Sequence, residues 1–409
     1  VTIDGVAVMN RVRGERDRFA GFVKDMVDDF PDRHLIRQNA RFIDDTTLEL
    51  GDGTQLTART VIVATGSRPA VPPPFEVAGD RLIINDDVFE WLDLPRSVAV
   101  FGAGVIGLEL GQALSRLGVR VHLFGLGNSV GPLSDPDLVS YARKTFGDEF
   151  TTHFDADTKI TREGDEIVVR WTDRNDASDT GVERFDYLLA ATGRRPNLDR
   201  IGLENTSLAL DDRGTPDIDH QSMQAKTKAG EASSIFVAGD SAVDLPLLHE
   251  AADEGRIAGE NAARYPQVYR RLRRTGLGVV FSDPQIAIAG RGYKDLIQTK
   301  TDFACGEVSF EDQGRARVIG KNKGLLRVYG DRATGMLLGA EMIGPAAEHI
   351  GHLLAWSIES RLTVSEILQR PFYHPVLEEG LRTALRNLAA ALELGPNPPL
   401  RCIDCGPGG

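Results

Sequence analysis

The chain has 409 residues, of which 41% are hydrophobic and 26% are charged, and its formal net charge is −13. A chain of this length is too long to fold around a single hydrophobic core. The proportions of hydrophobic and charged residues predict a globular protein of roughly two or three domains rather than a disordered chain. The acidic surplus argues against a nucleic-acid partner or an anionic membrane surface, because either would select a basic face. With three cysteines and no apolar run long enough for a bilayer, we expect a cytoplasmic protein without a disulfide framework.

The N-terminal part of the chain predicts helix first and short strands after it. Apolar side chains recur at helical spacing over residues 1–30, which favours one or two helices. Alternating segments then predict strands at 34–36, 40–42, 47–50, 55–58 and 60–64, with a hairpin turn at 51–53. Prolines at 69–74 and at Pro95 predict a domain boundary near residues 80–95. The chain starts at Val1 rather than Met, so we expect it to be part of a longer protein.

The most informative segment is 98–124, which predicts strand, glycine turn, helix and strand in succession. Gly102, Gly104 and Gly107 have the spacing of a dinucleotide fingerprint. Gly102 permits a tight turn, Gly104 lets the backbone approach a pyrophosphate, and Gly107 lets the helix press onto the sheet. Since the helix N-terminus then faces the phosphates, the segment predicts a nucleotide cofactor.

Further motifs predict a second nucleotide-binding region and a separate C-terminal domain. Two Ala-Thr-Gly turns, at 64–66 and 191–193, each follow an apolar strand, and segment 235–240 is a third strand closed by Gly-Asp. Segment 161–184 is expected to form an exposed hairpin. An α+β domain is predicted from strands at 306–310, 324–329 and 336–343 and helices at 346–359 and 375–392.

Seven motifs occur in the chain in a fixed order: ATGSRP at 64, GAGVIGLE at 102, ATGRRPN at 191, FVAGD at 236, FSDPQIAIAG at 281, GxxxGAEMIGPAAE at 335 and HPVLEE at 374. Together they resemble the class I pyridine nucleotide-disulfide oxidoreductases, of the dihydrolipoamide dehydrogenase and glutathione reductase type. The resemblance implies an α/β fold with two Rossmann-like nucleotide-binding domains, for FAD and NAD(P), and a C-terminal α+β dimerisation domain. The implied segments are 1–85 and 200–272 for FAD, 86–199 for NAD(P), 273–394 for the interface and 395–409 for a flexible tail.

The resemblance also implies an activity. It implies an FAD-dependent NAD(P)-disulfide oxidoreductase, most like dihydrolipoamide dehydrogenase, working as a homodimer on a small dithiol or disulfide or on a protein-bound lipoyl group. A soluble transhydrogenase, an NAD(P)H oxidase or a mercuric reductase on the same scaffold is an alternative. A non-catalytic relic that binds nucleotide or only dimerises is an alternative of another class.

Site residues follow from matching positions in the family motifs. His374 matches the general acid-base, Glu379 the acid that orients it, and Glu109 an acid near the redox rings. Read without its neighbours, His374 would only cap the helix predicted from residue 375. Asp240 matches the aspartate that binds the flavin ribityl chain. The remaining cofactor-binding positions are Gly102, Gly104, Gly107, Gly125, Gly193, Thr65, Gly66, Gly239, Leu248 and His249.

Parts of the family pattern are not found in the chain. The first FAD fingerprint and the helix with the redox cysteine pair are both missing, so we expect the chain as given to be incomplete and inactive. Gly125 stands where NAD-dependent relatives have an acid, and the residues after it carry no charge for a 2′-phosphate, so NAD is favoured on similarity and NADP stays open. Cys402 and Cys405 could form a mobile dithiol arm, incidental thiols in a disordered tail or half of a zinc site; no other metal site is predicted.

Overall fold

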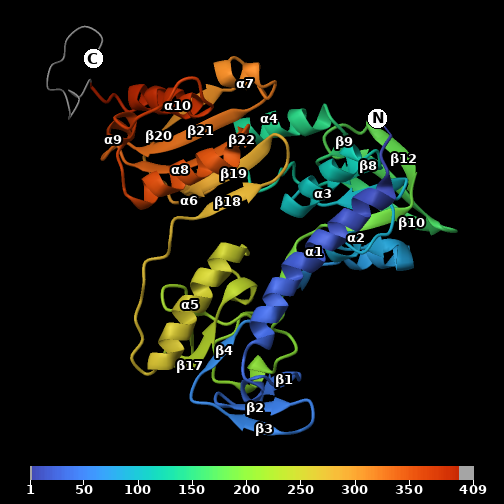
Figure 1. Cartoon of the computed structure of the whole chain (residues 1–409), viewed down its shortest axis with the longest axis vertical. Helices are drawn as coiled ribbons and strands as arrows, with labels where there is room; N and C mark the ends of the chain where they lie inside the picture. The colour runs from blue at the N-terminus through green and yellow to red at the C-terminus, as the bar shows by residue number, and fades with distance from the viewer. Residues whose placement is uncertain (1, 396–409) are drawn as a thin grey trace. The chain divides into compact units, whose positions relative to one another are not determined.

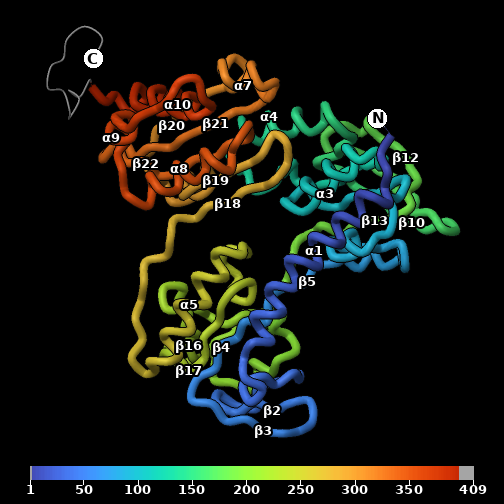
Figure 2. The backbone as a smooth tube through the Cα atoms, in the orientation of Figure 1, coloured from blue at the N-terminus to red at the C-terminus, as the bar shows by residue number. Residues whose placement is uncertain are grey.

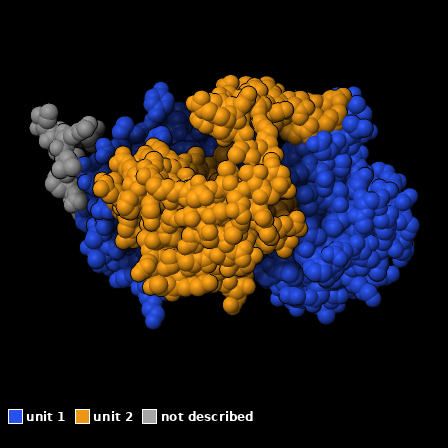
Figure 3. Space-filling view, turned by 90° about the horizontal axis from the view of Figure 1, so that it is seen from below, with its two compact units in different colours: residues 1–9, 71–192, 274–409 blue, residues 10–70, 193–273 orange. Residues whose placement is uncertain are grey.

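The computed structural model describes residues 2–395 of the chain, which forms two compact units (Figure 3). Unit 1 comprises residues 1–9, 71–192 and 274–409, and unit 2 comprises residues 10–70 and 193–273. Helix α1 (Gly5–Asp28) is a single helix, in line with the predicted N-terminal helix content. Within the described residues, no helix is both long and apolar enough to cross a membrane.

The first part of unit 1 is a five-stranded parallel sheet in the order β6-β13-β7-β8-β9. All five residues of β7 (Ser97–Phe101) are buried, as expected for a parallel strand covered on both faces. Helices α3 (Val105–Arg116) and α4 (Pro136–Gly147) contribute to its main core cluster. The other strands are β6 (Leu82–Ile83), β13 (Tyr187–Ala190), β8 (Arg120–Phe124) and β9 (Thr151–His153).

An antiparallel three-stranded sheet follows in the same unit, made of β10 (Ala156–Glu163), β11 (Glu166–Asp173) and β12 (Thr180–Phe185). The prediction of an exposed hairpin is wrong here. Ile167, Val168 and Val169 of the central strand are buried, because Ile167 and Val169 share a core cluster with Phe101 and Phe124 of the parallel sheet. The consecutive apolar residues were therefore a sign of burial rather than of surface alternation.

The last part of unit 1 is a five-stranded antiparallel sheet in the order β18-β19-β22-β21-β20 (Figure 1). Its strands are β18 (Leu277–Val280), β19 (Gln285–Gly290), β22 (Leu337–Gly344), β21 (Leu325–Asp331) and β20 (Phe303–Ser309). Helices α8 (Ala347–Glu359) and α10 (Glu378–Ala391) share its apolar core, and the short helices are α6 (Tyr293–Gln298), α7 (Gly314–Val318) and α9 (Val364–Leu368). The predicted α+β arrangement is confirmed.

Unit 2 has a four-stranded sheet in the order β15-β16-β17-β4, with helix α5 (Leu248–Arg264) against it. Figure 2 shows β4 (Val61–Val63), from the blue part of the chain, beside β17 (Ala232–Val237), with which it pairs in parallel. Strand β15 (Ile218–Asp219) is at one edge of the sheet, and its neighbour β16 spans Gln224–Lys226. Strand β5 (Ser67–Pro69) pairs antiparallel with β14 (Arg194–Pro196), which brings the two predicted Ala-Thr-Gly turns together.

The small meander of unit 2 consists of β1 (Ala40–Phe42), β2 (Thr47–Leu50) and β3 (Gln55–Thr57). The predicted hairpin between β2 and β3 is confirmed by their antiparallel register. The strand predicted at 34–36 is wrong: a 3-10 turn spans Asp32–His34, and residues 35–36 have no strand partner. A run this short becomes a strand only when a neighbour completes its hydrogen bonds.

Candidate functional site

The three glycines of the fingerprint turn after β7 differ in the space that a Cβ atom would have. Gly102 has φ +112°, and a Cβ there would lie 2.2 Å from the carbonyl oxygen of Ala191. A Cβ on Gly107 would lie 1.8 Å from the carbonyl oxygen of Gly102, so both positions are closed by backbone. A Cβ on Gly104, the N-cap of α3, would meet nothing within 4 Å. The open position faces the helix N-terminus, and this arrangement fits a pyrophosphate.

Gly125 lies directly after β8, at the strand end where a Rossmann fold contacts the adenosine ribose. A Cβ there would lie 2.9 Å from the carbonyl oxygen of Phe154, and the Gly125 N–H donates to the carbonyl of His153 at 2.7 Å. The strand end therefore has no room for the acidic side chain that NAD-binding Rossmann folds place there.

In unit 2, Asp240 lies in a 3-10 turn, Gly239–Ala242, that follows β17. Its Oδ2 accepts a hydrogen bond from the Ser67 hydroxyl at 2.5 Å, and Arg194 Nε donates to the same hydroxyl at 2.7 Å. Arg194 Nε lies 3.9 Å from Asp240 Oδ2, so the carboxylate has a cation beside it. Asp240 thus lies against β5 and β14, the strands that follow the two Ala-Thr-Gly turns.

The neighbouring predicted positions converge on this turn. Thr65 Oγ1 lies 3.2 Å from the hydroxyl of Ser241, and Gly66 has φ +68°. Gly193 has φ +101°, and its carbonyl accepts from the Ala70 N–H at 2.9 Å. Thr65, Gly66, Gly193 and Asp240 therefore share one region of unit 2.

A buried acid, which the sequence reading missed, fixes the backbone of this turn. Glu254 is 1% exposed, and its Oε2 accepts from the Gly239 N–H at 2.8 Å. Its Oε1 accepts from Arg273 Nη1 at 3.0 Å, while Glu250, also buried, accepts from Arg273 Nη2 at 2.6 Å. Burial is the largest influence on Glu254 and raises its pKa, against the lowering effect of Arg273. Two acids four residues apart on an alanine-rich helix were the available sequence signal.

Helix α5 begins at Leu248, close in sequence to the Asp240 turn. Leu248 is 88% exposed, the His249 side chain is also exposed, and Leu247 at the N-cap offers no side-chain hydrogen bond. The first N–H groups of this 17-residue helix have no acceptor within the helix, and the positive end of its dipole lies there. Together with the Asp240 carboxylate, this donor set fits the hydroxyl groups and electron-rich ring of a flavin.

The third group of predicted residues lies in the segment before α10. His374 Nδ1 lies 2.9 Å from Glu379 Oε1, and Glu379 Oε2 accepts from the Val376 N–H at 3.2 Å. The hydrogen bond with His374 is the largest influence on Glu379 and lowers the pKa of that carboxyl. The imidazole side chain is 81% exposed, so its Nε2 edge is available to a substrate.

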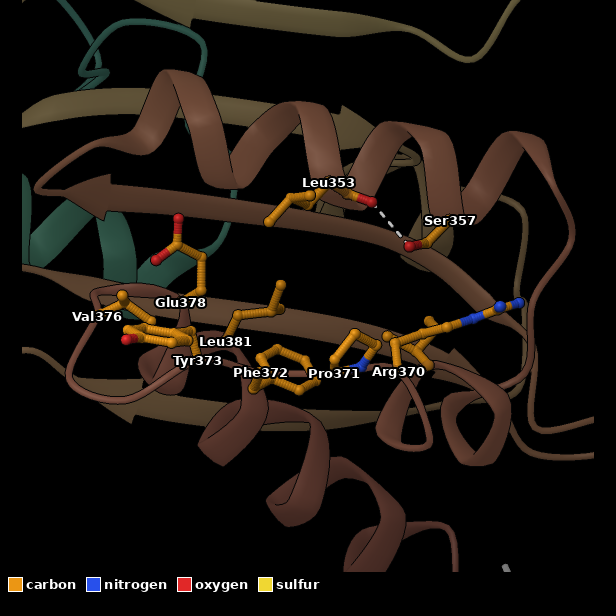
Figure 4. A pocket seen from close by; sticks show the side chains of 10 residues that line it. Leu353, Ser357, Arg370, Pro371, Phe372, Tyr373, Val376, Glu378 and Leu381 are labelled. Atoms are coloured by element: carbon orange, nitrogen blue, oxygen red, sulfur yellow. Dashed lines mark hydrogen bonds between the residues drawn. The ribbon is translucent and has the colours of Figure 1, made fainter. Parts of the chain in front are cut away.

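A cavity of about 330 Å³ lies beside this pair, between α8 and the start of α10 (Figure 4). Phe372, Leu381 and Leu353 contribute apolar surface to it, and Glu378 and Arg370 contribute charge. Tyr373 and the nearby Trp356 are 79% and 65% exposed, which is unusual for aromatic side chains of this size. The surface around His374 is thus apolar and open within the single chain.

Glu109 on α3 makes its contact elsewhere in unit 1. Its Oε1 accepts from the Phe281 N–H at 2.7 Å, and burial raises its pKa. Cys305 is half-buried beside Arg327, whose Nε donates to its sulfur at 3.2 Å. Across residues 2–395, no three His, Cys, Asp or Glu side chains are grouped to hold a metal ion. Cys402 and Cys405 lie outside the described residues.

Comparison with known proteins agrees with this architecture. Residues 29–255 match the family model described as pyridine nucleotide-disulphide oxidoreductase, and residues 277–385 match the dimerisation domain of the same family. Dihydrolipoyl dehydrogenase 2 of Haloarcula marismortui is 30% identical over 362 residues, covering 86% of this chain and 74% of its own length.

Two further relatives are similar over comparable lengths. The soluble pyridine nucleotide transhydrogenase of Serratia proteamaculans is 29% identical over 370 residues, covering 86% of this chain and 75% of its own length. The crystal structure of LpdA from Mycobacterium tuberculosis matches with a TM-score of 0.71 at 26% identity, covering 86% of this chain and 77% of that one.

The fold, the glycine turns and these matches define an FAD- and NAD-dependent oxidoreductase. The chain belongs to the pyridine nucleotide-disulphide oxidoreductase family, with the α+β part of unit 1 as its dimerisation domain. The resemblance found in the seven sequence motifs is confirmed.

Proposed function

We propose that the protein oxidises or reduces a dithiol, in the manner of a dihydrolipoyl dehydrogenase, with FAD and NAD(H) as redox cofactors. The observation that carries the proposal is the His374–Glu379 pair, with 2.9 Å between Nδ1 and Oε1, at an open apolar surface. Thiolate, not thiol, is the nucleophile in dithiol chemistry, so a base that titrates near neutral pH is required. Similarity to a dihydrolipoyl dehydrogenase supports the same substrate class.

Each residue has a proposed task. His374 Nε2 takes the proton from the substrate thiol, while Glu379 fixes the imidazole through Nδ1. Asp240 and the start of α5 hold the flavin, and Gly104 lets α3 receive the pyrophosphate of the nicotinamide nucleotide. Bound FAD supplies the two-electron exchange between the dithiol and NAD(H). Glu109 orders the backbone at Phe281 within unit 1.

We further propose a homodimer in which the surface around His374 is covered by a second copy. The dimerisation-domain match over residues 277–385 supports it, as do the exposed side chains of Trp356 and Tyr373. His374 would then act on a dithiol bound by the partner. A cytoplasmic location is proposed from the low cysteine content alone.

Replacement of His374 tests the catalytic assignment in the FAD-containing protein. His374→Ala should lower the turnover of dihydrolipoamide at least about 100-fold while the flavin absorption spectrum is unchanged. His34→Ala, at an exposed histidine of unit 2, is the matched control and should keep turnover. Unchanged turnover in His374→Ala would contradict the assignment.

A transhydrogenase is the second candidate, because the Serratia enzyme is about as similar as the dehydrogenase. Hydride exchange between two nicotinamide nucleotides needs no thiol base. If the protein is a transhydrogenase, His374→Ala should leave the rate of NADH-to-NADP exchange unchanged. If it is a dithiol oxidoreductase, the same variant should lose dithiol turnover.

A further inference from the structure

The loop after β8 has no room for the acid that NAD-binding Rossmann folds place at its start, yet an acid from the segment between β9 and β10 lies against it. Asp155 lies between β9 and β10, and its side chain is 12% exposed. Its Oδ1 accepts from the Gly127 N–H at 2.9 Å, and its Oδ2 accepts from Asn128 Nδ2 at 3.3 Å. A carboxylate therefore sits directly against the loop that follows Gly125.

The backbone of this loop depends on the same neighbours. Asn128 has φ +60°, and its N–H donates to the carbonyl of Phe154 at 3.2 Å. Its side-chain Oδ1 is buried and has no hydrogen-bond partner among the described residues. Leu126 and Ser129 are exposed and uncharged. Residues 126–129 of the loop thus carry no charge, and the charged side chain that contacts them is Asp155.

One nearby cation contacts Asp155, but it lies closer to another acid. Arg174 Nη1 lies 3.8 Å from Asp155 Oδ1, but its Nη2 lies 2.7 Å from Asp157, an exposed acid that it pairs with more closely. The Arg143 guanidinium lies over the ring of Phe154, 5.6 Å from its centroid. Of these two, Arg143 is the side chain that could offer a positive charge to a phosphate.

We propose that Asp155 takes the place of the acid missing after β8, and that its charge makes the chain select a nicotinamide nucleotide without a 2′-phosphate. In Rossmann folds an acid at this strand end favours the free 2′-hydroxyl, and an arginine accepts the 2′-phosphate. A fixed carboxylate in a partly buried position repels a phosphate dianion at close range. This inference rests on the nucleotide site in the proposed function and adds how that site distinguishes its two possible ligands.

Binding of two nucleotide fragments to the full chain tests the proposal without any redox reaction. ADP-ribose and 2′-phospho-ADP-ribose differ only in the phosphate, and neither carries a nicotinamide ring. By titration calorimetry, the native chain should bind ADP-ribose at least about tenfold more tightly, and Asp155→Asn should reduce this ratio about tenfold. The ratio in the native chain should also fall as salt rises, because screening weakens charge repulsion.

Two further variants separate charge from architecture. Asp155→Glu keeps the charge and should keep the ratio. Asp165→Asn removes one negative charge from the turn at the far end of β10, where the side chain is 84% exposed, and should leave the ratio unchanged. Retained ADP-ribose affinity in Asp155→Asn shows that the site is still folded.

Three results would overturn the proposal: an unchanged ratio in Asp155→Asn, an equal loss of the ratio in Asp155→Asn and Asp155→Glu, or a native chain that prefers the 2′-phospho form through Arg143. Failure of the dithiol reaction would appear in turnover by the FAD-containing protein and would not alter this ratio. The two proposals therefore fail independently.

Discussion

The glycine turn at Gly102 in unit 1 and the one at Gly239 in unit 2 are built in different ways. Both follow a buried strand and have positive φ, +112° and +69°. Backbone atoms of Ala191 enclose Gly102, whereas the Gly239 N–H is held by the side chain of Glu254. Ala191 and Glu254 both lie outside the turns that they close, so neither closure is contained in the turn's own segment. The first turn requires glycine for steric reasons, whereas the second depends on side-chain hydrogen bonds.

The largest expected effect is a difference in stability between substitutions at Gly107, which is closed by backbone, and at Gly104, which is open. Gly107→Ala should destabilise unit 1 by more than about 3 kcal/mol, because its Cβ would lie 1.8 Å from a carbonyl oxygen in a closed backbone. Gly104→Ala should stay folded, because its Cβ meets nothing within 4 Å. Nucleotide affinity should still fall about tenfold in Gly104→Ala, because the methyl group occupies the phosphate approach. Denaturant unfolding and ADP-ribose titration measure the two effects; equal stability of both variants would refute the distinction.

The stability of the Gly239 turn in unit 2 should instead depend on the side chain of Glu254. Glu254→Ala leaves the Gly239 N–H and one face of Arg273 without their acceptor, at an expected cost of about 3 kcal/mol of unfolding free energy. Glu254→Gln should cost less, since an amide oxygen can still accept from Gly239. Glu260→Ala removes a half-exposed acid from the same helix and should change stability by less than about 0.5 kcal/mol. Chemical denaturation of the three variants tests this order, and a Glu260 effect as large as that of Glu254 would contradict it.

The smallest expected effect concerns acid stability, in which the units should also differ. In unit 1 the rings of His122 and His153 lie 5.6 Å apart, and each has a buried ring nitrogen without a partner among the described residues. Burial, followed by the charge of His153, lowers the pKa of His122 to about 4. Burial also lowers the pKa of His153. The described histidines of unit 2, His34, His220 and His249, are half-exposed or exposed.

The sign of the pH effect follows from these lowered pKa values. Both rings stay neutral in the folded chain, while unfolded histidines take up protons below about pH 6.5, so stability is complete above that pH and declines toward pH 4. Because His122 is only partly buried, we expect unit 1 to lose about 1 kcal/mol between about pH 7 and pH 5. Calorimetric Tm values should show a smaller loss in His122→Phe and an unchanged loss in His34→Asn. An identical loss in His122→Phe would contradict this origin.

Much of the fold was predictable because its signals are local. The parallel strands β7, β8 and β13 are rich in apolar residues and lie next to glycine turns. In the segments that form β21, β22 and α8, the apolar residues favour two strands and a helix. The two errors have a shared cause. Burial of β11 depends on residues of the parallel sheet, and the lack of a strand at 34–36 depends on the lack of a neighbour. Neither fact is contained in the segment concerned.

In the candidate site too, contacts between residues close in sequence were predicted and contacts between distant residues were not. The five-residue spacing of His374 and Glu379 predicted an interaction, and the two side chains meet at 2.9 Å. Ser67 lies 173 residues from Asp240, and Asp155 lies 28 residues from Gly127. Nothing near Asp240 or Gly127 in the sequence indicates these partners.

By itself, the sequence determined the family, the glycine positions and the candidate catalytic pair, because the motifs and their spacing lie in residues that are close together along the chain. Only the tertiary structure decided that Glu254 and Arg273 hold the Gly239 turn and that Asp155 accepts a hydrogen bond from the Gly127 N–H. The physical reason is that hydrogen bonds and charges act over a few ångströms in space, whatever the separation along the chain.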